Sequence, residues 1–214
     1  MSMAIFRDRE DGGAALAEAL AKYKGADVVV YGLPRGGVVT AKVVATALQA
    51  PLDLIITRKL HHPLQPEYGV GAIAEDGQVV LNEREVAALP ADWLEREEQE
   101  QLREAKRRRA AYLGGRAPLP VRGKVAILVD DGIATGYTMK AAVLALRRLG
   151  PAKIVVAAPV APSTVAARFA GFADELVVPH TPDDFYAIGQ FYAEFDQVED
   201  DDVVALMQKR SEAA

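Results

Sequence analysis

Two adjacent carboxylates follow a short apolar run near the middle of the chain. Val125–Val129 are all apolar, and Asp130 and Asp131 come directly after them. An apolar run of this length predicts a buried strand, and ligands of α/β proteins bind at the carboxyl ends of such strands. Two carboxylates about 4 Å apart repel each other by about 4 kcal/mol at an effective dielectric constant of 20. The pair is therefore best accommodated where water, a cation or the hydroxyls of a sugar diol lie between the two acids.

The residues after the acids have the composition of a phosphate site. The segment 135–138, Thr-Gly-Tyr-Thr, opens a predicted helix over Tyr137–Leu149. It offers free backbone N–H groups, hydroxyls and the positive end of a helix dipole, which together bind phosphate. A diol site and a phosphate site a few residues apart describe a ribose 5-phosphate.

The whole string Val125–Thr138, VAILVDDGIATGYT, resembles the phosphoribosyl-diphosphate (PRPP) binding motif of type I phosphoribosyltransferases. The resemblance extends from about Val28 to about Tyr192. It implies that Asp130 and Asp131 hold the ribose hydroxyls and, directly or through water, Mg²⁺. It also implies a set of residues around the 5-phosphate: Ala134, Thr135, Gly136, Tyr137 and Thr138.

A second segment, residues 32–37, is similar to the diphosphate loop of that family. The resemblance implies that the backbone amides of Gly36 and Gly37 approach the diphosphate, while Arg35 adds charge-assisted hydrogen bonds. In the family this loop often contains a cis peptide bond between non-proline residues, which would fall here between Pro34 and Arg35.

Arg58 and Lys59 follow the second predicted strand and begin a segment that resembles the flexible catalytic loop of the family, running to Gly71. It would cover the diphosphate during the reaction. Arg58, Lys59 and Arg35 would then supply the positive charge that the chain as a whole lacks. Ordinary solvated charges at the end of a strand are the alternative for Arg58 and Lys59.

The acceptor pocket is predicted in the segment Pro179–Tyr192, which contains four aromatic residues. Phe185, Tyr186 and Ile188 are the candidates, because aromatic rings stack on planar bases. An aromatic core beneath a long loop explains the same residues equally well. Some purine enzymes of the family carry an acid where this chain has Ala134, so the sequence indicates neither the acceptor nor a general base.

Strands alternate with helices along the chain, which indicates an α/β fold with a parallel sheet covered by helices on both faces. The further predicted strands are Asp27–Gly32, Leu52–Thr57, Ile154–Ala157 and Glu175–Val178. Val70–Ala74 and Gln78–Leu81 are predicted to form a small hairpin. The further predicted helices are Glu10–Lys24, Val38–Leu48, Ser163–Phe169 and Glu199–Lys209.

The most charged segment is Asp92–Leu113, with acids in its first half and bases in its second. This order suits the dipole of a long helix, and Glu104 is placed to pair with Arg108 one turn later. The pattern favours a solvated helix over an RNA-binding stripe.

Length and composition limit the remaining possibilities. The 214 residues predict a single domain: a core over about 26–178, a hood over about 179–198 and a helical insertion over about 83–113. The absence of cysteine excludes thiol catalysis and disulfides. A net charge of −5 argues against broad nucleic-acid binding. No apolar run has the length of a membrane span, so we expect a cytoplasmic protein. The family resemblance implies a homodimer.

The resemblance implies a Mg²⁺-dependent phosphoribosyltransferase. It would transfer the 5-phosphoribosyl group of PRPP to a nitrogen nucleophile, such as a nucleobase, and release diphosphate. Asp130, Asp131, Arg35 and Lys59 are its predicted catalytic residues. The alternative is a non-catalytic protein of the same fold that senses PRPP or a nucleotide.

Overall fold

The computed structural model describes residues 4–208, so Lys209, the end of the last predicted helix, lies outside it. The body of the molecule is a parallel sheet in the order β2-β1-β6-β7-β8. Its strands are β1 (Val28–Gly32), β2 (Leu52–Leu54), β6 (Val125–Val129), β7 (Lys153–Ala157) and β8 (Glu175–Val177). The predicted α/β fold with a parallel sheet is confirmed.

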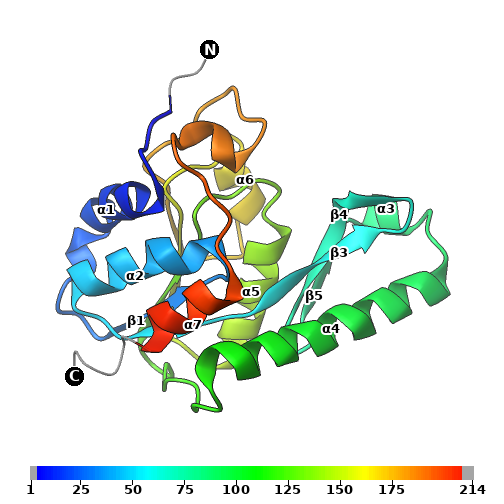
Figure 1. Ribbon diagram of the computed structural model, residues 1–214, viewed down its shortest axis with the longest axis horizontal. Coiled ribbons are helices and arrows are strands. Elements are labelled where there is room, and N and C mark those ends of the chain that lie inside the picture. Colours follow the sequence, from blue (N-terminus) through cyan, green and yellow to red (C-terminus); the bar gives the residue numbers. More distant parts are fainter. Residues whose placement is uncertain (1–3, 209–214) are drawn as a thin grey trace.

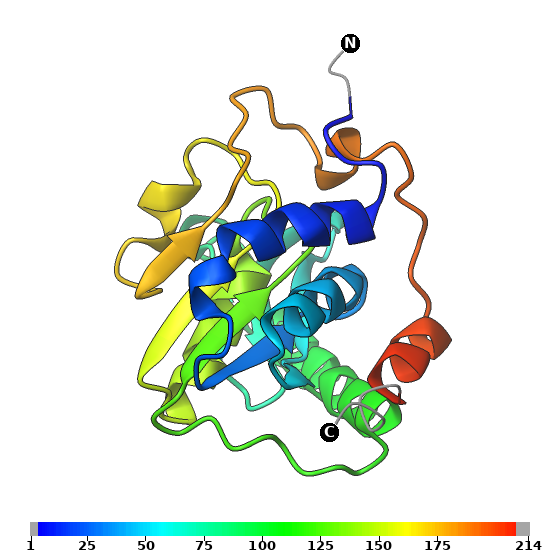
Figure 2. The ribbon, with the colours of Figure 1, turned by 90° about the vertical axis from the view of Figure 1, so that its left-hand side faces the viewer.

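Helices cover both faces of this sheet because each central strand alternates its apolar side chains between two cores. Val28 and Val30 face one core, and Val29 and Tyr31 face the other. The first core is closed by α1 (Arg9–Ala19), α2 (Gly36–Leu48), the end of α4 (Ala91–Leu113) and α7 (Asp200–Gln208). The second is closed by α5 (Tyr137–Arg148) and α6 (Val165–Phe169). Figure 2 shows α1 and α2 lying side by side over the sheet.

The register of the two central strands brings two loops together. β1 and β6 pair in parallel with Gly32 opposite Val129, and the N–H of Leu33 donates to the carbonyl of Val129 at 3.0 Å. The loop after β1 and the twin-aspartate turn after β6 therefore start side by side at the same edge of the sheet.

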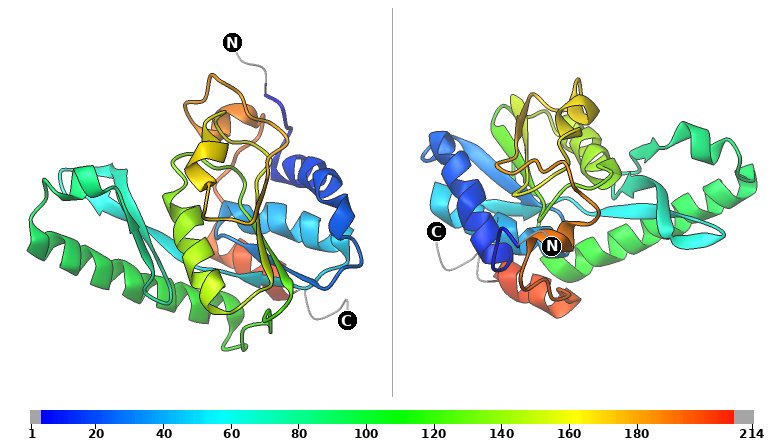
Figure 3. Two further views of the ribbon diagram at one scale, coloured as in Figure 1. Left: turned by 180° about the vertical axis from the view of Figure 1, so that it is seen from behind. Right: turned by 90° about the horizontal axis from the view of Figure 1, so that it is seen from above.

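An arm projects from this body (Figures 1 and 3). It contains an antiparallel sheet in the order β3-β4-β5, with α3 and α4 beside it. Its elements are β3 (Thr57–His62), β4 (Gln65–Ala74), β5 (Val79–Leu81), α3 (Glu83–Val86) and α4 (Ala91–Leu113).

The arm corrects two expectations. The segment 58–71, predicted as a flexible loop, forms most of a β-hairpin, because Leu60, Val70 and Ile73 bury their side chains in a core of the arm. The predicted strand Leu52–Thr57 is divided: β2 ends at Leu54 in the parallel sheet, and Thr57 starts β3.

The helix α4 is charged but only partly solvated. The predicted pair is present, with Arg108 Nε donating to Glu104 Oε1 at 2.7 Å. Ala105, Tyr112 and Leu113, however, are buried in the first core of the body. Apolar residues recur at helical spacing along one face of α4, opposite its charged face. This apolar face packs on both the arm and the body, so the helix links the two.

The segment 179–198 folds over the carboxyl edge of the sheet together with the start of the chain. It contains the short 3₁₀ helix η2 (Ile188–Phe191), whereas the other 3₁₀ helix, η1 (Ala21–Tyr23), follows α1. The N–H groups of Ile5 and Phe6 donate to the carbonyl of Phe191, both at 2.9 Å. This pairing places the beginning of α1 beside the twin-aspartate turn.

Candidate active site

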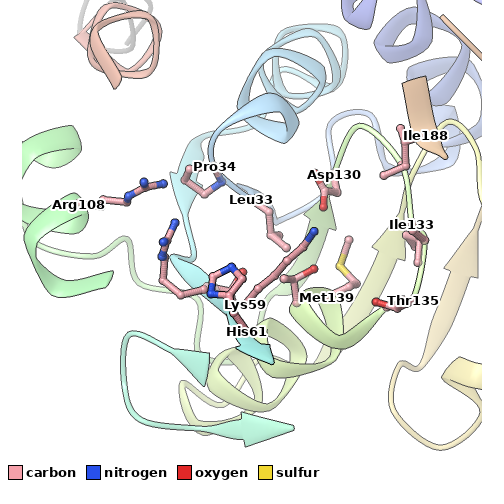
Figure 4. A pocket seen from close by; sticks show the side chains of 16 residues that line it. Leu33, Pro34, Lys59, His61, Arg108, Asp130, Ile133, Thr135, Met139 and Ile188 are labelled. Atoms are coloured by element: carbon pink, nitrogen blue, oxygen red, sulfur yellow. The ribbon is translucent and has the colours of Figure 1, made fainter. Parts of the chain in front are cut away.

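A pocket of about 330 Å³ lies at the carboxyl edge of the parallel sheet, where the arm joins the body (Figure 4). Its walls come from the loop after β1, the start of β3, α4, the segment between β6 and α5, and η2. Pockets of this size accommodate small molecules. Asp130, Arg58, Lys59 and most of the predicted phosphate turn are among the lining residues.

Asp130 lines the pocket, and its carboxylate accepts a hydrogen bond of 2.9 Å from the N–H of Asp131. Burial, reinforced by the charge of Asp131, raises the pKa of Asp130 well above its ordinary value, and Lys59 opposes this effect. Figure 4 shows Lys59 extending across the pocket toward Asp130. A hydroxyl donor or a cation beside the Asp130 carboxylate would offset this cost of burying its charge.

Asp131 lies behind the pocket wall and is 8% exposed. Its Oδ2 accepts a hydrogen bond of 2.7 Å from Arg9 Nε, and its backbone carbonyl accepts one of 2.5 Å from the hydroxyl of Tyr192. Burial raises the pKa of Asp131 and Arg9 counteracts this. To bind the ribose as predicted, the Asp131 carboxylate would have to release Arg9 or accept hydrogen bonds from Arg9 and the ribose together.

Arg9 was missed by the sequence analysis, and Tyr192 was included there only among the aromatic residues of the hood. The guanidinium of Arg9 also donates to the carbonyl of Asp196 at 2.7 Å and lies 3.8 Å from the centre of the Phe195 ring. Arg9 belongs to a charged helix start, and nothing in its local sequence distinguishes it from a solvated base. Only the pairing of the first residues with the hood brings it to Asp131.

The loop after β1 packs directly on the two acids. A side chain at Gly36 would collide with the carboxylate of Asp131, and one at Gly37 would come 2.5 Å from Asp130 Oδ1. The peptide bond between Pro34 and Arg35 is cis, as the resemblance implies. The close approach to the acids thus explains both glycines, whether or not they also bind diphosphate.

The predicted diphosphate residues of this loop are Arg35, Gly36 and Gly37, and the structure describes all three. None of them lines the pocket, whereas Leu33 and Pro34 do. Arg35 points to the start of α7, where its guanidinium pairs with Glu199 Oε2 at 2.9 Å. Contact between Arg35 and a ligand in the pocket would require this ion pair to open.

The predicted phosphate turn leads into the first residues of α5. Ala134, Thr135, Gly136 and Thr138 line the pocket, whereas Tyr137 packs against the second core. Gly136 has a φ of 84°, and a side chain there would approach the Phe169 ring to 3.1 Å. The first N–H groups of a helix have no partners within the helix, so this turn can bind an anion.

A basic wall formed by Arg58, Lys59, His61 and Arg108 faces the twin-aspartate turn. Arg58 Nε donates to Gln101 Oε1 at 3.0 Å, and burial together with the charge of Arg108 lowers the pKa of Arg58. His61 lies 3.2 Å from Glu97 Oε1. Arg108 was predicted only to pair with Glu104 on a solvated helix, and His61 lay within the predicted segment 58–71 without being singled out.

The predicted acceptor residues do not form a common pocket in this conformation. Ile188 lines the pocket, but Phe185 packs on Phe191 with ring centres 5.1 Å apart. Tyr186 is 89% exposed. Phe185 therefore belongs to an aromatic core beneath the hood, which was the alternative explanation for these residues.

Within residues 4–208, no group of three or more His, Cys, Asp or Glu side chains could hold a metal ion. Asp130 lines the pocket with its carboxylate, and Mg²⁺ commonly binds through one or two carboxylates with substrate phosphates and water completing the shell. The site thus fits a magnesium ion that arrives with a phosphorylated substrate and does not fit a closed protein cage.

Comparison with known proteins agrees with this geometry. Residues 5–170 match the family model of the phosphoribosyl transferase domain, and the chain belongs to this family. Two curated Mycobacterium tuberculosis proteins, from strains CDC 1551 and H37Rv and provisionally named phosphoribosyl transferases, are each 49% identical over 209 residues. That match covers 97% of the chain but only 47% of each relative, so the chain spans about half their length.

A solved structure, that of the protein TT1426 from Thermus thermophilus, is similar throughout. Its TM-score is 0.79 at 41% identity, and the match covers 97% of this chain and 99% of that one. Among the helices described here, none is long and apolar enough to cross a membrane.

Proposed function

We propose that this protein is a Mg²⁺-dependent phosphoribosyltransferase, which transfers the 5-phosphoribosyl group of PRPP to a nitrogen nucleophile and releases diphosphate. The observation that carries the proposal is the composition of a single pocket. Asp130, the anion-binding turn before α5 and the basic wall from the arm all line it. A ribose with a phosphate at one end and a diphosphate at the other needs all three: an acceptor for its hydroxyls, an anion site for the phosphate and positive charge for the diphosphate.

Each wall has a separate role in this proposal. The N–H groups and hydroxyls at 135–138 bind the 5-phosphate. Asp130 accepts hydrogen bonds from the ribose hydroxyls, which offsets the unfavourable burial of its charge. Arg58, Lys59 and Arg108 neutralise the diphosphate as the bond to the ribose carbon C1 breaks.

Catalysis would then consist of positioning and electrostatic stabilisation. The pocket holds the ribose while positive charge develops at C1 and negative charge develops on the departing diphosphate. Bound Mg²⁺ would supply further neutralisation of the diphosphate oxygens. The acceptor nitrogen would approach from the side bordered by Ile188, the hood residue that lines the pocket.

Calorimetry with PRPP tests the site. We expect PRPP to bind in the presence of Mg²⁺ and the Asp130→Asn variant to bind it at least about tenfold more weakly, since a charged acceptor is replaced by a neutral amide. Asp183→Asn, which changes an exposed acid in the hood, is the matched control and should bind as the unmodified protein does. Unchanged affinity in Asp130→Asn would contradict the assignment.

A PRPP-sensing protein is the second candidate, favoured by one observation. Among the described residues that line the pocket, Asp130 is the sole carboxylate, so no second acid there is placed to accept a proton from an acceptor. Diphosphate release from PRPP, measured with purine, pyrimidine and related acceptors, separates the two functions. Release with any acceptor supports the transferase; tight PRPP binding without release from any acceptor supports the sensor.

A further inference from the structure

His61, which lines the basic wall of the pocket, is hydrogen-bonded to a glutamate of α4. The Nδ1 atom of His61 lies 3.2 Å from Glu97 Oε1, and the backbone N–H of His61 donates to the same oxygen at 3.0 Å. The Glu97 side chain is 13% exposed, so this contact is largely shielded from water. Figure 4 shows the His61 ring beside Lys59 on the pocket wall. Glu97 therefore fixes one nitrogen of a ring that borders the pocket.

A buried glutamine determines which atoms donate in this cluster. The Arg58 guanidinium has only donors, and its Nε donates to Gln101 Oε1 at 3.0 Å. The amide nitrogen of Gln101 is then the atom that donates to Glu97 Oε1, at 3.2 Å. Gln101 is 8% exposed, and buried polar groups of this kind bond within the protein. Glu97 thus accepts N–H groups from Gln101 and from the backbone of His61, which suits an ionised carboxylate.

This network assigns the proton of the neutral His61 ring. An ionised carboxylate only accepts hydrogen bonds, so Nδ1 must be the nitrogen that donates to Glu97. In the neutral ring the other nitrogen, Nε2, then carries a lone pair and no proton. Nε2 has no hydrogen-bond partner among the described side chains. Protonation of the ring places an N–H at Nε2 and converts this atom from an acceptor into a donor.

The charged groups around His61 come from both sides of the pocket. Three cations and two acids surround it: Arg58, Lys59, Arg108, Glu97 and Asp130. The cations oppose protonation of the ring, whereas Glu97 favours it. An anion bound at the wall would act in the same direction as Glu97. Asp130 also titrates above its ordinary range, because burial raises its pKa, so a test must separate its titration from that of His61.

We propose that His61 binds the diphosphate group as an imidazolium that donates from Nε2, and that the neutral ring, with its lone pair at Nε2, does not bind it. Glu97 is the positioning residue, because its hydrogen bond keeps the single proton of the neutral ring on Nδ1. The inference rests on the proposed function, which assigns this wall to diphosphate. It makes the affinity for diphosphate fall as the pH rises through the range of about 5 to 8 in which imidazole titrates.

Calorimetry with inorganic diphosphate on the full chain tests the role of His61. At about pH 6, where imidazole is largely protonated, His61→Gln should bind diphosphate at least about fivefold more weakly than the unmodified chain. At about pH 8.5 the two proteins should differ by less than about twofold, since the neutral ring donates nothing. The titrations of diphosphate and of Asp130 affect both proteins alike, so the ratio of their affinities isolates His61.

His62 provides the matched control, because it follows His61 on β3 and is absent from the pocket lining. Its Nδ1 accepts a hydrogen bond of 3.1 Å from the N–H of Leu64 in the adjacent turn. His62→Gln should bind diphosphate within about twofold of the unmodified chain at both pH values. Urea unfolding verifies that each variant is folded before binding is measured.

Nitrogen-15 NMR of the histidine rings tests the role of Glu97 without any ligand. The chain has three histidines, and the His61→Gln and His62→Gln variants assign their signals. At about pH 8.5 the proton of His61 should lie on Nδ1 in the unmodified chain. In Glu97→Met, which lacks the acceptor, it should move to Nε2. A proton on Nε2 in both proteins would overturn the proposal, as would one on Nδ1 in both.

The outcomes separate this inference from the function on which it rests. Equal affinity ratios at the two pH values, or equal losses in His61→Gln and His62→Gln, would overturn the role of His61 alone and leave the transferase proposal standing. No binding of diphosphate by the unmodified chain at either pH would contradict the assignment of the wall to diphosphate, which both proposals share.

Discussion

At the scale of single residues, the ion pair between Arg9 and Asp131 organises the twin-aspartate turn. The side chains of the pair are 12% and 11% exposed. A buried carboxylate is tolerated when it is paired and hydrogen-bonded, and Arg9 provides both while Phe195 stacks on its guanidinium. Arg9 is thus a positioning residue, since it acts on the site through Asp131.

Replacing Arg9 should destabilise the fold. We expect Arg9→Gln to lower the free energy of unfolding by about 3 kcal/mol, because an unpaired carboxylate would remain buried. Urea denaturation measures the change. Arg7→Gln is the matched control: Arg7 pairs with Asp8 but its side chain is 69% exposed, so its loss should cost less than about 1 kcal/mol. Equal losses in the two variants would contradict a special role for Arg9.

At the scale of elements, the strand–turn–helix unit β6–α5 is the part of the site that forms from contiguous residues. Gly136 is its critical point, because its positive φ turns the chain into α5 and Phe169 leaves little room for a side chain. The turn also explains why the helix begins at the pocket wall, with its free N–H groups at the cavity.

Gly136→Ala should therefore affect stability and ligand binding together. A non-glycine residue with positive φ costs about 1 kcal/mol or more, and the contact with Phe169 adds to that cost. We expect a loss of about 2 kcal/mol in urea denaturation and at least a tenfold loss of PRPP affinity by calorimetry. Gly171→Ala separates the effects: its φ is 78°, but a side chain there meets nothing within 4 Å. It should show the backbone cost alone, with PRPP affinity unchanged.

The arm is the element that sequence reasoning described least well. Leu52–Ile56 is a largely apolar run, so periodicity alone did not show that the chain leaves one sheet after Leu54 and enters another at Thr57. The apolar residues of β3 and β4 indicate a core only when α4 is placed against them. Val125–Val129, whose buried strand is followed by the two acids, was predicted with its exact limits.

At the scale of the whole molecule, an acidic chain builds a basic wall by folding the arm against the body. The net charge is −5, yet β3 and α4 bring Arg58, Lys59 and Arg108 to one side of the first pocket. A local concentration of one sign of charge can attract a ligand of the opposite sign despite the net charge.

Arg108 tests this arrangement. We expect Arg108→Gln to weaken PRPP binding about tenfold in calorimetry, because a cation is removed from the pocket wall. Arg103→Gln on the exposed side of the same helix makes the same charge change and should have an effect below about twofold. Equal effects of the two variants would show that α4 acts through general charge, contrary to the proposed contact.

The sequence by itself determined the parts of the site that lie within one short segment. An apolar strand, two acids and a turn rich in glycine and hydroxyls are local features, so their order predicted the phosphate turn and the place of Asp130. The tertiary structure alone decided which distant residues join them. Arg9 meets Asp131 across 122 positions, and the place of Arg108 in the pocket wall depends on how α4 packs against the body. Such contacts depend on the register of the strands and the docking of the helices. The residues that form them carry no local sequence signal for either.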